Sequence, residues 1–124
     1  MKIINSKTHA VLDYLMVMIL LVSPNLFDLG EKASLLCYTL GIIHFLLTIC
    51  TDFSAGIFKL INLKLHGLIE LAVSVILMVL AFTVFEADLK EEIYFACLSL
   101  LILFIFLLTD YNKKPSMVRR KSHP

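Results

Sequence analysis

The chain contains one tandem duplication, and this repeat limits what it can fold into. HAVLD at residues 9–13 returns as HGLIE at 66–70, DLGE at 28–31 returns as DLKE at 88–91, and TDF at 51–53 returns as TDY at 109–111. Each half therefore has the order His-x-x-x-acid, apolar stretch, acidic turn, apolar stretch and Thr-Asp-aromatic. A duplicated sequence of this kind predicts two copies of one helical hairpin.

The apolar stretches are long enough to cross a bilayer. The chain has 124 residues, 60% of them hydrophobic, and a mean hydropathy of +0.92, which is more apolar surface than one small soluble core buries. Four segments, residues 10–27, 33–51, 65–85 and 93–109, are each near the ~20 residues needed to span ~30 Å of hydrocarbon. In lipid a segment must satisfy its own backbone polar groups, which favours helices. The sequence thus predicts an all-α, polytopic membrane protein: a four-helix transmembrane bundle made of two tandem hairpins.

The basic residues predict how this bundle is oriented. Residues 1–59 form the first hairpin repeat, residues 60–112 the second, and residues 113–124 a basic tail. Most lysines and arginines fall on one side of the spans: Lys2, Lys7, Lys59, Lys64, Lys113, Lys114, Arg119, Arg120 and Lys121. Only Lys32 and Lys90 fall on the other side. By the positive-inside rule we expect a multi-pass protein of the cell membrane, with both termini and the 53–64 loop in the cytoplasm.

Short motifs predict where the helices end. The first span is expected to end at Ser23-Pro24-Asn25, because proline disfavours helix for its predecessor. The repeated acidic turns have capping-box spacing, with Asp28 paired to Glu31 and Asp88 paired to Glu91. We therefore expect the two aspartates to cap the second and fourth spans.

Helical spacing predicts which side chains face the interior. The predicted interior stripes are His9, Asp13, Met16, Leu20 and Ser23 in the first span; Cys37, Gly41, His44, Thr48 and Thr51 in the second; and His66, Glu70, Val73, Leu77 and Leu80 in the third. Each stripe carries ionisable or weakly polar groups at its cytoplasmic end. A bundle would bring these ends together.

The ionisable residues of the stripes are the candidate functional residues. His9 and Asp13 lie one helical turn apart, as do His66 and Glu70. The predicted cluster is His9, Asp13, Asp52, His66, Glu70 and Asp110, two histidines and four carboxylates in one layer, with His44 as a secondary candidate. His44 is expected to be an interior histidine bonded to a neighbouring Ser or Thr. Four ionised acids in a partly dry place would repel, so they require protonation, pairing with a cationic side chain or a bound cation.

Three interpretations of this cluster remain open. The leading one is structural: ion pairs and hydrogen bonds would fix the helices, and the protein would serve a structural or partner-binding role. The alternatives are a metal site, as in carboxylate-bridged four-helix bundles, and a proton or ion pathway. We expect no enzymatic activity, because no nucleophile, phosphate-binding or dinucleotide motif is present, and no cofactor. The expected partners are the lipid bilayer and a membrane-protein partner or second copy, and not nucleic acid.

The motif order also resembles a known family. It is carried in the first copy by His9, Asp13-Tyr14, Ser23-Pro24 and Thr51-Asp52-Phe53, and in the second copy by His66, Glu70 and Thr109-Asp110-Tyr111. This pattern is similar to the SPW-repeat family of small integral membrane proteins. The family's Trp is replaced by Asn25, and the second copy has no proline at the corresponding turn. The resemblance implies two transmembrane helices per repeat and no established chemistry.

Overall fold

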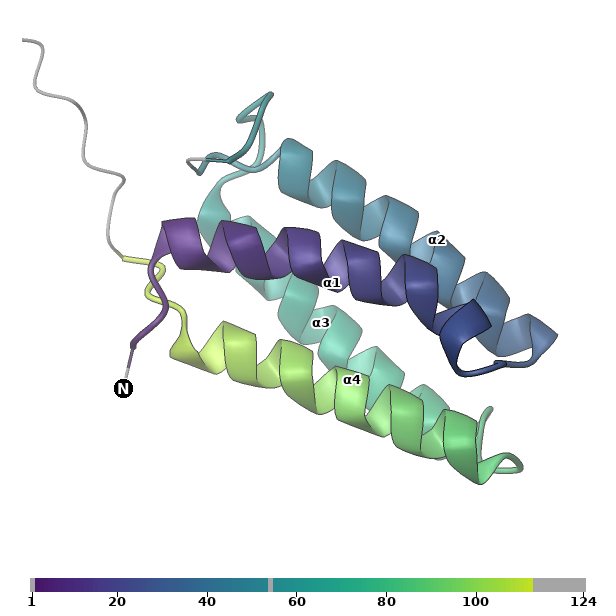
Figure 1. Cartoon of the computed structure of the whole chain (residues 1–124). Helices are drawn as coiled ribbons and strands as arrows, with labels where there is room; N and C mark the ends of the chain where they lie inside the picture. The colour runs from purple at the N-terminus through teal and green to yellow at the C-terminus, as the bar shows by residue number, and fades with distance from the viewer. Residues whose placement is uncertain (1, 54, 113–124) are drawn as a thin grey trace, which may run out of the picture.

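The protein is a bundle of four antiparallel helices, seen here in a computed structural model that describes residues 2–53 and 55–112 (Figure 1). The helices are α1 (Ser6–Leu26), α2 (Glu31–Ile49), α3 (Leu63–Ala81) and α4 (Leu89–Leu108). Each has 19 to 21 residues and is apolar enough to cross a membrane. At 1.5 Å per residue such a helix is about 30 Å long, which matches the hydrocarbon thickness. The predicted all-α four-helix bundle is therefore confirmed.

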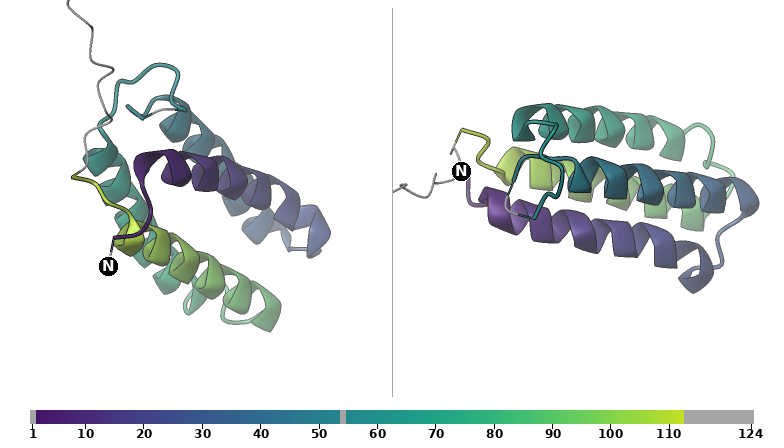
Figure 2. Two further views of the ribbon diagram at one scale, coloured as in Figure 1. Left: turned by 60° about the vertical axis from the view of Figure 1, so that its left-hand side comes forward. Right: turned by 90° about the horizontal axis from the view of Figure 1, so that it is seen from above.

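The bundle consists of two hairpins, as the repeat predicts. Helix α1 packs along α2, and α3 packs along α4. The two hairpins lie side by side, so that α1 and α3 face each other across the bundle (Figure 2). The start of α1, the end of α4 and the loop from α2 to α3 lie at one end of the bundle, and the two short turns lie at the other. We call the first of these ends the terminal end. It carries both histidine motifs.

The predicted interior stripes do face the interior. In α1 the side chains of His9, Asp13, Met16, Leu20 and Ser23 are all buried. The stripe of α3 is buried at His66, Glu70 and Leu77, and its other two members are half-buried. Most of the apolar core lies away from the terminal end, where Phe85 stacks on Phe95 with 4.4 Å between ring centroids. The buried histidines and carboxylates, apart from Glu91, are thus concentrated at the terminal end of a largely apolar bundle.

The turns at the opposite end follow the prediction in one copy only. Asp88 is the N-cap of α4, and its carboxylate accepts hydrogen bonds from the backbone N–H groups of Lys90 and Glu91. The equivalent prediction for Asp28 is wrong, because α1 continues through Pro24 to Leu26 and leaves a short turn in which Asp28 has a φ of 49°. Gly30 is the N-cap of α2 instead.

A side chain from the other hairpin compensates at that cap. The backbone N–H of Gly30 donates to Oε1 of Glu91, at 2.6 Å. The carboxylate therefore supplies the acceptor that the first turn lacks, and Glu91 is buried as a result. This hydrogen bond links the two hairpins at the end opposite to the histidines.

At the terminal end, short extended segments pair with the ends of α2 and α4. Ile61 pairs with Thr51, and Ile4 pairs with Thr109, each through an isolated parallel bridge. The backbone N–H groups of Asp52 and Asp110 donate to the carbonyls of Ile61 and Ile4, at 2.7 and 2.8 Å. A histidine follows five residues after each of these isoleucines: His66 follows Ile61, and His9 follows Ile4. The bridges therefore fix each histidine beside the threonine of a neighbouring helix end.

Both histidine-bearing helices also begin in the same way. Asn5 and Asn62 are the N-caps of α1 and α3, and their side chains accept hydrogen bonds from the backbone N–H groups of Thr8 and Leu65. An N-cap of this type satisfies one of the donors that a helix start leaves free. Each cap stands four residues before its histidine. The Ile-Asn pairs at 4–5 and 61–62 thus form a further element of the repeat, in addition to the three motifs that the sequence shows directly.

Candidate functional site

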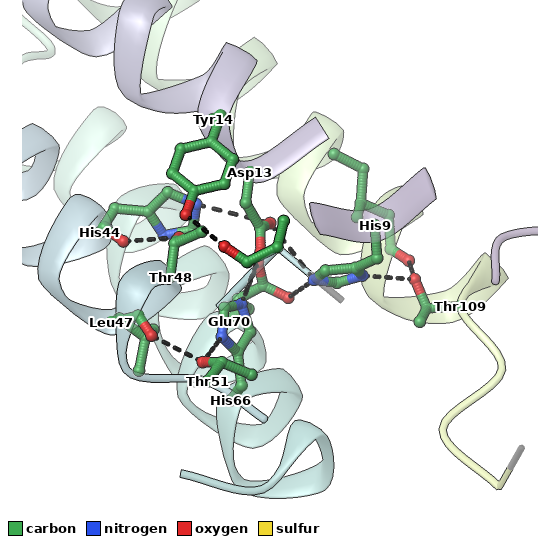
Figure 3. Close-up of polar contacts among 12 residues, drawn as sticks. His9, Asp13, Tyr14, His44, Leu47, Thr48, Thr51, His66, Glu70 and Thr109 are labelled. Atoms are coloured by element: carbon green, nitrogen blue, oxygen red, sulfur yellow. Dashed lines mark hydrogen bonds and ion pairs between the residues drawn. The ribbon is translucent and has the colours of Figure 1, made fainter. Parts of the chain in front are cut away.

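Two histidines and two carboxylates meet between α1 and α3 at the terminal end of the bundle (Figure 3). His9 and Asp13 come from α1, and His66 and Glu70 come from α3. All four are buried; both histidines are 0% exposed, Asp13 is 1% exposed and Glu70 is 5% exposed. One potential ligand atom from each side chain lies within 4.8 Å of the others. We call these four residues the His/carboxylate cluster.

The contacts within the cluster form a closed ring. Nε2 of His9 lies 3.3 Å from Oδ1 of Asp13 and 3.2 Å from Oε2 of Glu70. Nε2 of His66 lies 3.1 Å from Oδ2 of Asp13 and 3.2 Å from Oε1 of Glu70. Each carboxylate therefore faces both histidines with a different oxygen. The arrangement has the approximate two-fold symmetry of the repeat, with Asp13 and Glu70 as equivalent members.

The other ring nitrogen of each histidine is held by a threonine of the opposite repeat. Nδ1 of His9 lies 2.8 Å from Oγ1 of Thr109, and Nδ1 of His66 lies 2.7 Å from Oγ1 of Thr51. Thr51 stands at the end of the first repeat and Thr109 at the end of the second. Each histidine is thus bonded across the boundary between the hairpins.

These threonines determine which ring nitrogen carries the proton. The hydroxyl of Thr109 donates its proton to the carbonyl of Ile105, and that of Thr51 donates to the carbonyl of Leu47, each at 2.6 Å. A hydroxyl has one proton to donate, so each threonine accepts from the Nδ1–H of its histidine. In a neutral imidazole the lone pair is then on Nε2. Both lone pairs are directed into the cluster.

The atoms at the centre of the cluster are not paired by hydrogen bonds. Among the described residues, the buried atoms without a partner include Nε2 of both histidines, Oδ2 of Asp13 and Oε2 of Glu70. Buried polar atoms are normally satisfied, so several orphans at one point require an explanation. The nitrogens and oxygens are close, but their directions do not suit hydrogen bonds to one another.

His44 approaches the same cluster from α2. Its Nε2 atom lies 3.6 Å from Oδ1 of Asp13 and is also without a hydrogen-bond partner in the described part of the chain. The expected bond to a neighbouring hydroxyl is not made, since Thr48 donates to the backbone carbonyl of His44 and not to its ring. His44 therefore faces the cluster, whereas the repeat places Ile102 at the equivalent position of α4.

Two of the predicted carboxylates lie outside the cluster. Asp52 is exposed, and Asp110 is half-buried with its carboxylate accepting from the backbone N–H of Asn112. The expectation that four carboxylates share one layer is therefore wrong. The reason is that α2 and α4 end before these residues, and the chain turns so that the preceding threonines point inward instead.

Aromatic rings close the cluster at the terminal end. Phe53 contacts His66, with 5.9 Å between ring centroids, and Tyr111 contacts His9, with 6.0 Å between ring centroids. Burial, and next the nearby charge of Glu70, raises the pKa of the Tyr111 phenol above its ordinary value. The ring of Tyr111 also lies on Gly67, where an added Cβ would come within 2.5 Å of it. These rings separate the histidines from the water at the bundle end.

Comparison of the chain with family models, with curated proteins and with solved structures gave no match. The likeness to the SPW-repeat family therefore stays a prediction, and the site is interpreted from its own geometry.

Proposed function

We propose that this membrane protein binds a divalent first-row transition metal ion in the His/carboxylate cluster. The observation that carries the proposal is the convergence of four buried side chains on one point with their central atoms unpaired. An ion at that point would be bound by the nitrogen lone pairs and the carboxylate oxygens together. It would satisfy all of these atoms at once.

The distances suit ligands of one ion better than direct ion pairs. A charge-assisted N–H···O hydrogen bond is about 2.7–2.9 Å long. Adjacent ligands at about 2.1 Å from a metal lie about 3.0 Å apart in octahedral and about 3.4 Å apart in tetrahedral geometry. The four N···O distances in the cluster, 3.1 to 3.3 Å, fall between these two values.

The ligand set also suits such an ion. Imidazole and carboxylate together favour zinc, iron or manganese, and the cluster has no thiolate that would favour copper(I). Metal-binding histidines commonly donate their second N–H to a fixed acceptor, which is the role of Thr51 and Thr109. Two neutral histidines, two carboxylates and a divalent cation have no net charge, which reduces the cost of burial in a membrane.

A bound ion would also serve the structural role that the sequence predicts for the cluster. Helices of different hairpins approach one another much less closely than the helices within a hairpin. An ion bound by α1 and α3 would join the hairpins directly. The ion's binding energy would then contribute to folding, as in other structural metal sites. We further propose, from the basic residues, that the site lies toward the cytoplasmic face.

The first test measures bound metal in the purified protein and in matched carboxylate variants. Zinc, iron and manganese would be counted by elemental analysis after loading with each ion and removal of the excess. The wild type should retain one ion per chain, and Asp13→Asn and Glu70→Gln should each lose it. Asp52→Asn and Asp110→Asn change carboxylates outside the cluster and should retain the wild-type content.

The second test is thermal unfolding with and without a chelator. A ligand that binds only the folded state stabilises it by about 2.7 kcal/mol at a hundred times its Kd. Chelation should therefore lower the Tm of the wild type by several degrees and leave the Asp13→Asn variant unaffected. A wild type that holds no metal and melts identically in both conditions would show that the cluster is an ion-pair network instead.

A further inference from the structure

A small apolar cavity lies against the His/carboxylate cluster. Its volume is about 40 Å³, and Glu70 and His44 are the polar members of its lining. The rest of the lining is apolar and comes from all four helices, with Met16, Leu47, Val73 and Ile102 among its members. The cavity therefore connects the polar cluster to the apolar interior of the bundle.

The cavity also reaches the outer surface of the bundle. Ile43, which forms part of its lining on α2, is 54% exposed, and Ile69 on α3 is half-buried. In a membrane this surface faces hydrocarbon. A molecule that enters here would come from the lipid and would have to be uncharged, because a charge is costly in that region.

The size and chemistry of the cavity limit what it holds. One water needs about 10–15 Å³ on this measure, so a cavity of this volume has room for two or three heavy atoms. An apolar lining disfavours water, and one polar wall favours a molecule that binds there at one end. The two polar lining residues, Glu70 and His44, each have a buried atom without a hydrogen-bond partner in the described residues, Oε2 and Nε2 respectively.

A metal ion in the His/carboxylate cluster would be the binding partner for such a molecule. Catalytic and sensing metal sites keep a coordination position open for an exogenous ligand. The two histidines and two carboxylates of the cluster would supply four of the six ligands of an octahedral iron(II) ion, which leaves positions open for a molecule such as dioxygen. His44 breaks the two-fold symmetry of the cluster on the side of the cavity, where its ring would contact a molecule bound to the ion.

We propose that the metal centre has an open coordination position toward His44, and that a small uncharged molecule such as dioxygen reaches it from the lipid through this cavity. This inference rests on the proposed metal site. It goes beyond that proposal because the metal could be bound without any access for a second ligand.

The experiment uses nitric oxide as the probe, on the full chain loaded with iron(II) in detergent under anaerobic conditions. Iron content and the electron paramagnetic resonance signal of the iron–nitrosyl adduct are measured on the same sample. Val73→Phe and Leu47→Phe fill the cavity from α3 and α2. Val75→Phe and Leu46→Phe add the same volume on the lipid-facing sides of those helices, where the native residues are 56% and 52% exposed.

We expect a nitrosyl signal in the wild type and in the two lipid-facing variants, in proportion to bound iron. The two cavity variants should bind as much iron as the wild type and give at least tenfold less signal. Equal signals from the cavity variants and their controls, or stoichiometric iron that gives no nitrosyl signal in the wild type, would overturn this inference and leave the metal site intact. A wild type that retains no iron, zinc or manganese would overturn both proposals.

Discussion

Replacement of Thr51 by valine tests whether this threonine keeps the ring proton of His66 on Nδ1 and so leaves the Nε2 lone pair free to bind a metal. The substitution keeps the shape of the side chain and removes the hydroxyl that accepts from Nδ1–H of His66, at 2.7 Å. Thr51 and His66 are both 0% exposed, so water does not replace the lost acceptor. A buried donor left without a partner costs about 1–3 kcal/mol, and loss of such a supporting bond weakens metal binding about 10–100-fold. A 10–100-fold loss of affinity corresponds to about 1.4–2.8 kcal/mol, which falls within the range of about 1–3 kcal/mol for the unpaired donor.

Thr48 provides the matched control for this substitution. Its hydroxyl is equally buried, stands three residues earlier in the last turn of α2 and donates to the backbone carbonyl four residues before it, as that of Thr51 does. In the described residues it makes no hydrogen bond to an imidazole. Affinity would be measured by competition with a chromophoric chelator in detergent. Thr51→Val should weaken binding at least tenfold and Thr48→Val less than twofold; equal effects of the two would refute the assignment of the Nε2 lone pair to the metal.

Three further predictions follow from the packing and charge of the bundle. Gly67→Ala would place a Cβ 2.5 Å from the ring of Tyr111 and should destabilise the protein by about 1–3 kcal/mol in thermal unfolding, unless Tyr111→Ala is present as well. In a double-mutant cycle without metal, Asp13→Asn and Glu70→Gln should be coupled by more than ~0.5 kcal/mol, because both face the same histidines; strict additivity would contradict a shared network. Reporter fusions at Lys90 and in the 113–124 tail should lie on opposite sides of the membrane, and equal sidedness would exclude the predicted topology.

The fold was largely predictable because hydrophobicity and the repeat act over whole segments. Four apolar stretches of nearly the same length are sufficient to predict four helices, and an even number per copy predicts parallel hairpins. The end of a helix depends on local geometry and was harder to predict. Asp28 has the same spacing to its glutamate as Asp88, yet only Asp88 caps its helix, because the continuation of α1 through Pro24 changes the preceding turn.

The four residues of the His/carboxylate cluster were predictable from the sequence, whereas the positions of Asp52 and Asp110 were not. Helical spacing alone placed His9 beside Asp13 and His66 beside Glu70 on interior faces. The positions of Asp52 and Asp110 depend on backbone bridges to distant segments, which no local spacing reveals. The threonines were visible as motif members, but their partners are set by tertiary structure. The repeated Ile-Asn pairs before the two histidine helices were the one available signal, since they mark the segments that pair with the threonine motifs.

The bond between His9 and Thr109 also determines when the site is complete. These residues are 100 positions apart, near opposite ends of the described chain. During synthesis α1 is made before α3 and α4. His9 and Asp13 therefore lack their partners across the bundle until α3 is in place, and the ring of His9 is not oriented until the end of α4 is present. A chain in which α4 is not yet in place therefore lacks the finished geometry of the cluster. The proposed metal ion would therefore be captured only after the two hairpins have docked.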